Sequence, residues 1–272
     1  MSQHEQVPVG ETQERVLVDM EVDAPVGVVW AALRDPAEVR RWFGWDDVGL
    51  AAEIEEIFVE RAQVDDDART ITWADGDRFA LEERGEKTRV LAMRRGHAGV
   101  EPFNGVHDAI DEGWITFTQQ LRFSLERHRG EDRRTAFATL DLGPEDDPLL
   151  ARLGLRDLGE QVRGGAYSVD RPDGTTFSGE VFFQTDLQVG LTVAEEGDAL
   201  LVIARTPPAV APPNGQVMFV LSTFGLDDTS LEGLEGRWTA WWGPSDADAD
   251  ADAEVRDGTV PGTAAADDEP VA

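Results

Sequence analysis

The sequence predicts an α+β protein built from antiparallel sheets, each followed by a closing helix. Three observations support this prediction. Residues 15–23 alternate between apolar and polar side chains, which is typical of a half-buried strand. The strand patterns before residue 110 lead into an amphipathic helix, and the same order recurs between residues 135 and 243. We therefore predict a tandem repeat, although the two halves share few identical residues.

The first unit opens with a strand and two helices. Ala24-Pro25 ends the strand, and one face of the next helix carries Val26, Val29, Trp30 and Leu33. Asp35-Pro36 ends this helix and begins a second, with Asp35 as its N-cap and Pro36 in its first turn.

The stretch from Ala51 to Arg95 predicts an antiparallel meander. Ile54, Ile57 and Phe58 indicate its first strand, and a tight turn is expected at residues 74–77. Further strands are expected at 70–73, 78–83 and 88–93. After a loop over 96–110, Asp111 is expected to cap the long helix, whose apolar face is Trp114, Phe117, Leu121 and Leu125.

The second half repeats this order without the opening helices. A short helical piece is expected at 148–158, and strands are expected at 135–142, 161–169, 176–184, 188–193, 200–206 and 216–223. Caps at 227–230 precede a helix that carries Trp238, Trp241 and Trp242. Three tryptophans exceed what one helix face needs, so we expect them to dock onto the first unit.

These patterns predict four segments. Residues 1–14 form a disordered N-terminus, and residues 244–272 form a disordered acidic tail of Asp-Ala alternation, which cannot bury enough apolar surface to order itself. The two folded units are expected at 15–130 and 135–243.

The run VDAPVGVVWAALRDP at 22–36, continued by Arg41-Trp42-Phe43, resembles the opening of the START-like (SRPBCC) superfamily. In particular it resembles the branch named after the C-terminal domain of the activator of heat shock protein 90 ATPase. Gly113-Trp114, followed by Leu121 and Leu125, resembles that family's closing helix, and the likeness covers about residues 15–130. It implies a helix-grip fold, in which an antiparallel sheet curls around a long C-terminal helix and leaves a cavity between them.

The chain departs from that family in two places. Residues 53–58, EIEEIF, contain no glycine where family members usually carry a glycine-rich strand. The second half lacks the opening motif, so we interpret it as a degenerate START-like copy.

Composition narrows the classes of function. The net charge is −31, and only nine acidic residues and one arginine lie after residue 243, so the body itself is acidic and repels nucleic acid and anionic lipid. The adjacent pairs Arg40-Arg41, Arg94-Arg95 and Arg133-Arg134 are interpreted as solvated surface. The absence of cysteine excludes thiol chemistry, and no apolar run approaches the roughly 18 residues of a membrane span. The first ten residues do not read as a secretory signal, and we expect a cytoplasmic protein.

No catalytic motif is present, and no cofactor is expected. His97 and His107 share a loop region, but no histidine pair has metal-ligand spacing, so no metal site is predicted. The leading hypothesis is a non-enzymatic protein that binds a small hydrophobic molecule. The alternatives are a chaperone-associated protein-interaction module and a cyclase or hydratase acting on a bound polyketide-like substrate. A protein partner and the oligomeric state are left open. The residues expected to line the ligand cavity are Trp30, Trp42, Trp73, Phe79, Trp114, Phe117 and Leu121.

Overall fold

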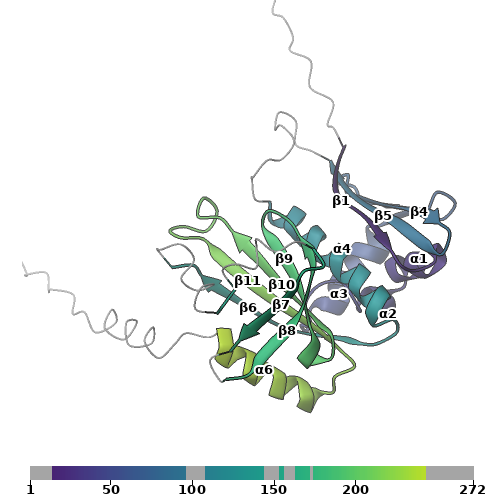
Figure 1. Ribbon diagram of the computed structural model, residues 1–272. Helices are drawn as coiled ribbons and strands as arrows, with labels where there is room; N and C mark the ends of the chain where they lie inside the picture. The colour runs from purple at the N-terminus through teal and green to yellow at the C-terminus, as the bar shows by residue number, and fades with distance from the viewer. Residues whose placement is uncertain (1–13, 96–107, 144–152, 156–162, 172–173, 243–272) are drawn as a thin grey trace, which may run out of the picture.

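A computed structural model describes residues 14–95, 108–143, 153–155, 163–171 and 174–242. It contains two antiparallel sheets, with the long helix α4 (Ala109–Arg127) between them (Figure 1). The expected N-terminal and C-terminal disorder and most of the helical piece expected at 148–158 fall outside the described residues. No helix in the described part of the chain is long and apolar enough to cross a membrane.

Sheet A belongs to the first half and has the strand order β1-β5-β4-β3-β2. Its first strand therefore lies beside its last, and the others follow in reverse order. The strands are β1 (Glu14–Val22), β2 (Gln63–Asp65), β3 (Thr70–Thr72), β4 (Arg78–Arg84) and β5 (Lys87–Arg95). In β1, Val18, Met20 and Val22 are buried while the alternate residues face outward, as the period-two pattern predicts.

The connection from β1 to β2 contains helices and turns but no strand. It contains α1 (Val26–Arg34), α2 (Pro36–Val39), α3 (Leu50–Ile54) and the π-helix η1 (Glu55–Glu60). Asp35 caps α2 as predicted, because its carboxylate accepts the Ala37 N–H at 2.9 Å. The strand expected around Ile54 and Phe58 is wrong, since both residues lie in this helical segment and are buried there.

Helix α4 begins earlier than the sequence predicted. Asp108, not Asp111, is the N-cap, and its carboxylate accepts the N–H groups of Ile110 and Asp111. Asp111 lies in the first turn and is 3 % exposed, so the side chain taken for a cap is buried in an ion-pair cluster instead.

Sheet B belongs to the second half and has the order β6-β11-β10-β9-β8-β7. The same rule holds, with the first strand beside the last. Its strands are β6 (Arg133–Asp141), β7 (Ala166–Asp170), β8 (Thr176–Gln184), β9 (Gln188–Val193), β10 (Ala199–Thr206) and β11 (Gln216–Phe224). A short 3-10 turn, η3 (Ala194–Glu196), follows β9, and α6 (Asp228–Trp242) closes the unit. The chain is thus α+β, with the helix-grip order of elements in both halves.

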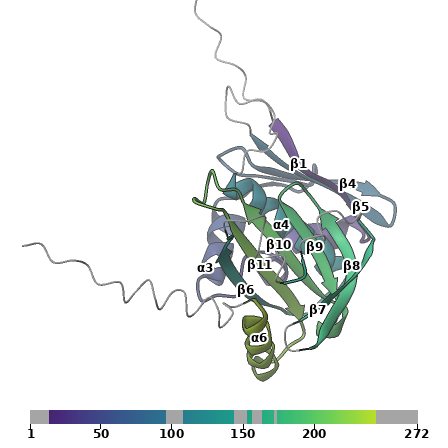
Figure 2. The same ribbon diagram turned by 60° about the vertical axis from the view of Figure 1, so that its left-hand side comes forward.

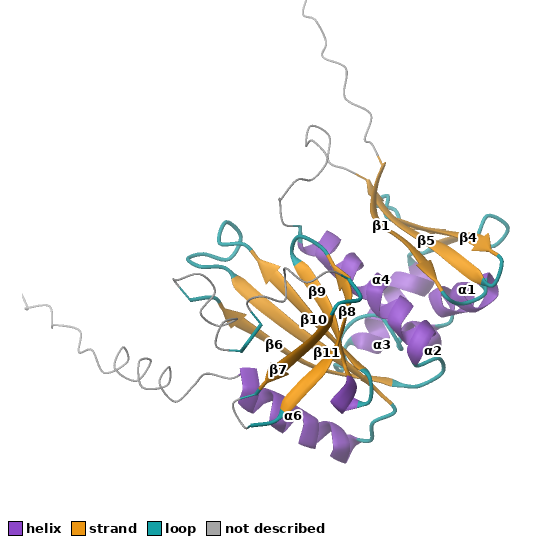
Figure 3. Ribbon diagram, in the orientation of Figure 1, coloured by secondary structure: helices purple, strands orange, loops and turns teal. Residues whose placement is uncertain are grey.

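Helix α4 is buried on two sides (Figure 3). Phe117, Leu121 and Leu125 belong to the core beneath sheet A. Phe123 belongs to a second cluster with residues of sheet B, among them Phe182 and Val220. One helix therefore serves as the closing helix of the first sheet and as a layer on the second.

Helix α6 covers the face of sheet B that is turned away from α4 (Figure 2). Leu201 and Ile203 of β10 belong to the core with α6, while Leu200 and Val202 belong to the cluster with α4. Each face of β10 is therefore buried.

The three tryptophans of α6 do not dock onto the first half. Trp238 and Trp241 pack on Phe177, and Trp242 stacks on Phe219 at 5.9 Å between ring centroids. That expectation was wrong because a strand face lined with phenylalanines can absorb all three rings within the second half. The division into units at 15–130 and 135–243 stays a prediction.

Candidate functional site

Six aromatic rings converge between sheet A and α4, and we call them the aromatic cluster. They are Phe43, Phe58, Trp73, Phe79, Trp114 and Phe117. Trp114 is the centre, with ring-centroid distances of 5.3 Å to Phe79 and 5.4 Å to Trp73. Phe117 lies 4.8 Å from Phe43. These are edge-to-face and tilted contacts of the kind that aromatic pairs prefer.

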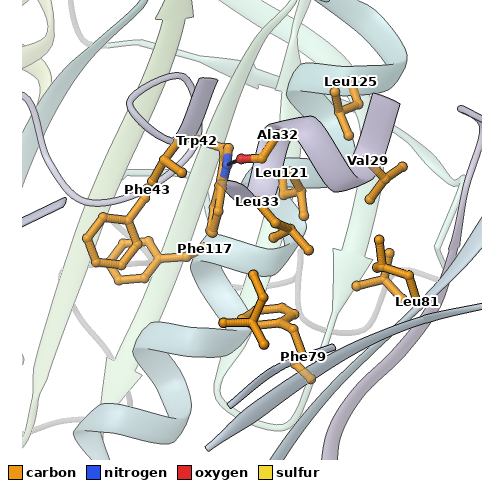
Figure 4. Packing of buried hydrophobic residues seen from close by; sticks show 14 of the residues in the cluster. Val29, Ala32, Leu33, Trp42, Phe43, Phe79, Leu81, Phe117, Leu121 and Leu125 are labelled. Atoms are coloured by element: carbon orange, nitrogen blue, oxygen red, sulfur yellow. Dashed lines mark hydrogen bonds between the residues drawn. The ribbon is translucent and has the colours of Figure 1, made fainter. Parts of the chain in front are cut away.

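Distant parts of the sequence supply these rings. Phe79 comes from β4, Trp73 from the end of β3, and Trp114 and Phe117 from α4. Phe43 follows α2, and Phe58 comes from the π-helix η1. Figure 4 shows Phe43 and Phe117 side by side, with Leu121 and Leu125 further along α4. A π-helix is rare and often lies at a functional site, and this one contacts the cluster directly.

Three tryptophan N–H groups in and beside the cluster already have acceptors. Trp42 donates to the Ala32 carbonyl at 2.8 Å, and Trp73 donates to the Ile57 carbonyl at 2.7 Å. Trp114 donates to Asp77 Oδ2 at 2.9 Å. What the cluster offers a ligand is therefore its apolar ring faces, with one carboxyl group beside them.

The structure brings most of the residues expected in the pocket together. Trp73, Phe79, Trp114 and Phe117 belong to the cluster, and Trp42 packs on Phe43 at 5.8 Å. Leu121 is fully buried in the same core.

Trp30 is placed differently from those six. Its N–H donates to Asp66, and the guanidinium groups of Arg34 and Arg69 lie 5.5 Å from its ring centroid. Its indole is therefore occupied by polar partners of its own. Whether any of the seven residues binds a ligand stays a prediction.

A buried ion-pair cluster adjoins Trp114. Arg94 is its centre, with Nε 3.0 Å from Asp77 Oδ1, and Nη1 2.6 Å from Asp111 Oδ1 and 3.0 Å from Asp108 Oδ1. Arg15 Nη2 lies 2.5 Å from Asp111 Oδ2. Three carboxylates thus face two guanidinium groups at the point where β5 meets the first turn of α4.

The protonation equilibria of this cluster are shifted in different directions. Burial raises the pKa of Asp77 above its ordinary value, because it outweighs the hydrogen bond from Trp114 and the charge of Arg94. The pKa of Asp108 is lowered from its ordinary value. Burial alone would raise it, but the hydrogen bonds from the N–H groups of α4 and the charge of Arg94 together outweigh burial. Arg94 stays charged, since Asp111 and the neighbouring carboxylates raise its pKa despite burial.

Sequence reasoning missed this cluster, because the pair Arg94-Arg95 was interpreted as solvated surface. Arg94 is 8 % exposed and Arg133 is 5 % exposed, so the interpretation as solvated surface was wrong for one member of the pair Arg94-Arg95 and for one member of the pair Arg133-Arg134. Both pairs lie in strands, where neighbouring side chains point to opposite faces. An arginine pair inside a strand therefore sends one cation inward, and this was the available signal.

The histidines give no metal site in the described part of the chain. His97 and His107 lie outside the described residues, and His128 is stacked on Phe224 at 4.2 Å between ring centroids. No group of three or more His, Asp or Glu side chains among the described residues could hold a metal ion.

Two open hollows of about 470 Å³ lie in the second half. One is at the end of sheet B and includes Asp186, Arg205 and Pro213. The other lies between η3 and α6 and includes Glu195, Ser230 and Arg237. Neither involves the aromatic cluster.

No family model matches the chain, and no curated protein matches it. Several solved structures resemble it loosely, among them two di-domain ARO/CYC proteins and a third protein, DynU16. The di-domain ARO/CYC BexL from the BE-7585A biosynthetic pathway is 14 % identical over 89 % of this chain and 93 % of its own, with a TM-score of 0.33. The di-domain ARO/CYC StfQ from the steffimycin biosynthetic pathway is 13 % identical over 90 % and 96 %, with a TM-score of 0.31.

The third structure is DynU16, described as a putative protein in the dynemicin biosynthetic locus. It is 17 % identical over 83 % of this chain and 93 % of its own, with a TM-score of 0.29. The fold class of this chain rests on its own two antiparallel sheets and on the helices that pack against them, which agree with the helix-grip fold that the START-like resemblance implies.

Proposed function

We propose that this protein binds a small, flat, apolar molecule between sheet A and α4, with the aromatic cluster as the binding surface. The observation that carries the proposal is the convergence of six rings from five separate segments onto one buried place. A core needs apolar volume, but it does not need so many rings in one spot beside a π-helix. Flat ring faces select a ligand that can stack on them.

The rings pack against one another, so binding requires some of them to move. Trp114 is the ring best placed to do so, because it is only partly buried while Phe79 is 2 % exposed. A ligand that buries roughly 300 Å² of apolar surface gains about 7.5 kcal/mol. After the cost of displacing a ring, we expect a dissociation constant weaker than about 1 µM.

The first test is native mass spectrometry of protein purified from its own host, which looks for a retained small molecule. The second is titration with the neutral dye Nile red, compared between the parent protein and Phe117→Ala. Phe123→Ala is the matched control, because it removes the same ring from the opposite side of α4. Binding by the parent that hydrophobic competitors displace supports the proposal. Binding by Phe117→Ala alone shows that the truncation created the pocket, and the proposal then fails.

One observation favours a second candidate, a cyclase or hydratase acting on a polyketide-like substrate. Asp77 is a buried carboxyl group with a raised pKa, and it bonds the indole of Trp114. A carboxyl group of this kind beside a bound substrate can exchange a proton with the substrate. Asp77→Asn keeps the shape and removes the proton transfer. If the protein is an enzyme, this variant retains ligand binding and loses turnover; unchanged turnover excludes Asp77 as the acid or base.

A further inference from the structure

The interface between α4 and sheet B contains several buried polar atoms that have no hydrogen-bond partner among the described residues. Three are donors on neutral side chains, namely Trp45 Nε1, Gln120 Nε2 and the Ser222 hydroxyl, which can also accept. A fourth is Arg133 Nε, which carries part of a positive charge. A buried donor left without a partner destabilises the folded state, so four in one interface need an explanation.

The side chains that carry these atoms are neighbours. Arg133 Nη1 donates to Gln120 Oε1 at 2.6 Å, which fixes the orientation of that amide and leaves its NH₂ without a partner. Arg133 Nη2 donates to the carbonyls of Phe43 and Gly44, immediately before Trp45.

Ser222 joins the group through the neighbouring strand. It lies directly opposite Thr135 in the β6–β11 register, and the Thr135 hydroxyl accepts the Asp46 N–H at 2.7 Å. Thr135 is two residues from Arg133 on the same strand, so the two side chains share a face.

Arg133 is a buried cation that contacts no carboxylate in the described part of the chain. Its three acceptors are two backbone carbonyls and one amide oxygen, all of them neutral. Burial lowers the pKa of Arg133 to about 9, so the guanidinium remains charged at neutral pH. A buried charge is costly unless an opposite charge accompanies it.

The surrounding charges offset that of Arg133 only in part. Asp46 is the carboxylate acting on Arg133, but its own oxygens are bonded by Arg40, at 3.3 Å, and by Arg134. Arg134 is shared further with Asp228 at 2.7 Å. Arg40, Arg133 and Arg134 thus lie near only two carboxylates, those of Asp46 and Asp228.

We propose that this interface binds a small carboxylate, held by Arg133 and by the N–H and O–H groups of Trp45, Gln120 and Ser222. A carboxylate only accepts hydrogen bonds and carries a charge opposite to that of Arg133, so its chemistry suits all four donors. The adjacent Gln119 Oε1 is an unpartnered acceptor, which suits a hydroxyl group on the ligand or a water beside it. The Trp45 ring packs on Phe117 at 5.2 Å, so the carboxylate site borders the aromatic cluster without sharing its ring faces.

Sodium acetate is the probe, and sodium chloride at equal ionic strength is the reference. The full chain is melted at increasing concentrations of each salt, and calorimetric titration gives the stoichiometry. We expect a saturable rise in Tm with acetate, roughly 5–10 °C at a hundred times the dissociation constant, with one site per chain. An equal rise in chloride, or none in either salt, overturns the proposal and leaves the donors to buried water.

Two mild variants test the assignment without removing the buried cation. Trp45→Phe deletes one N–H and keeps a ring, and Ser222→Ala deletes one hydroxyl. Each is expected to weaken acetate binding by about 10-fold or more, since a hydrogen bond to a charged group is lost. Trp30→Phe and Ser178→Ala are the matched controls, because their polar atoms bond elsewhere, to Asp66 and to Glu195. If Trp45→Phe and Ser222→Ala bind acetate as tightly as these controls do, the assigned site is wrong.

Discussion

Truncation of Phe123 tests the most consequential feature of the fold, the burial of α4 on both sides. Phe123 is fully buried on the sheet B side of the helix, with ring centroids 5.1 Å from Phe182 and 5.9 Å from Phe224. A buried Phe cut to Ala costs about 3–5 kcal/mol, and aromatic partners favour the upper part of that range. We expect Phe123→Ala to lower the free energy of unfolding by about 4–5 kcal/mol, or Tm by roughly 8–20 °C.

The assay is urea unfolding followed by far-ultraviolet circular dichroism and by tryptophan fluorescence. Because α4 belongs to both cores, the two signals are expected to report one transition that moves as a whole. Ile110→Ala is the control on the same helix, since Ile110 is 55 % exposed, and its effect is expected to stay within about 0.5 kcal/mol. A loss under about 1 kcal/mol for Phe123→Ala, or a separate transition of the first half that does not move, would refute the shared core.

Four further predictions follow from the packing. Asp108→Ala is expected to lower the free energy of unfolding by about 1–2 kcal/mol at pH 7, and Asp108→Asn by less, because Asn still caps a helix. Folding lowers the pKa of Asp108, so the difference between Asp108→Ala and the parent is expected to disappear as the pH falls below 3.8 through the folded-state pKa. Urea titrations at several pH values measure this difference, and a difference that stays constant with pH contradicts the prediction. The Cβ added by Gly236→Ala in α6 meets open space, and this variant is expected to stabilise the protein by about 0.5–1 kcal/mol. Gly179→Ala places a Cβ 2.1 Å from a backbone oxygen and is expected to destabilise the protein by more than about 1 kcal/mol. Thermal melts in which both variants shift Tm in the same direction contradict this prediction. A fragment of residues 14–130 exposes the sheet B side of α4 and is expected to aggregate in analytical ultracentrifugation; a stable monomer would show that the first half folds alone. A chain ending at Gly243 is expected to keep the parent Tm, and a drop of several degrees would show that the acidic tail packs.

Elements with a clear period were predictable from the sequence. β1, α1, β4, β5 and the apolar face of α4 lie where the patterns placed them. Apolar residues that recur with a period of two or of 3.6 residues indicate the buried face of a strand or a helix, and these faces are buried in the structure.

The segment around Ile54 and Phe58 was not predictable in this way. Two buried residues four apart fit a helix turn, but a short apolar run also fits a strand, and the family resemblance favoured a strand. The π-helical spacing of η1 matches neither period, so the local pattern could not decide between them.

The residues of the candidate site were also only partly predictable from the sequence. Four of the six rings of the aromatic cluster could be named from the sequence, because large aromatic residues at core positions have few other places to go. Phe43 and Phe58 were not among the residues predicted to line the cavity. The partners of Asp77 and Arg133 could not be named, because they lie 17 and 37 residues away for Asp77, and 13 and 90 residues away for Arg133. Such pairings depend on tertiary packing, which no local period encodes.

The position of α4 has a mechanical consequence. A helix pressed between two sheets cannot move away from one without pushing into the other, since protein interiors are close-packed. Phe117 touches the first sheet's cluster, and Phe123, less than two turns further on, touches the second sheet. A molecule that wedges apart the rings around Phe117 therefore displaces a rigid rod whose far side bears on β8 and β11. If a ligand binds at the aromatic cluster as proposed, its occupancy of the first half is therefore expected to strain the packing of the second half.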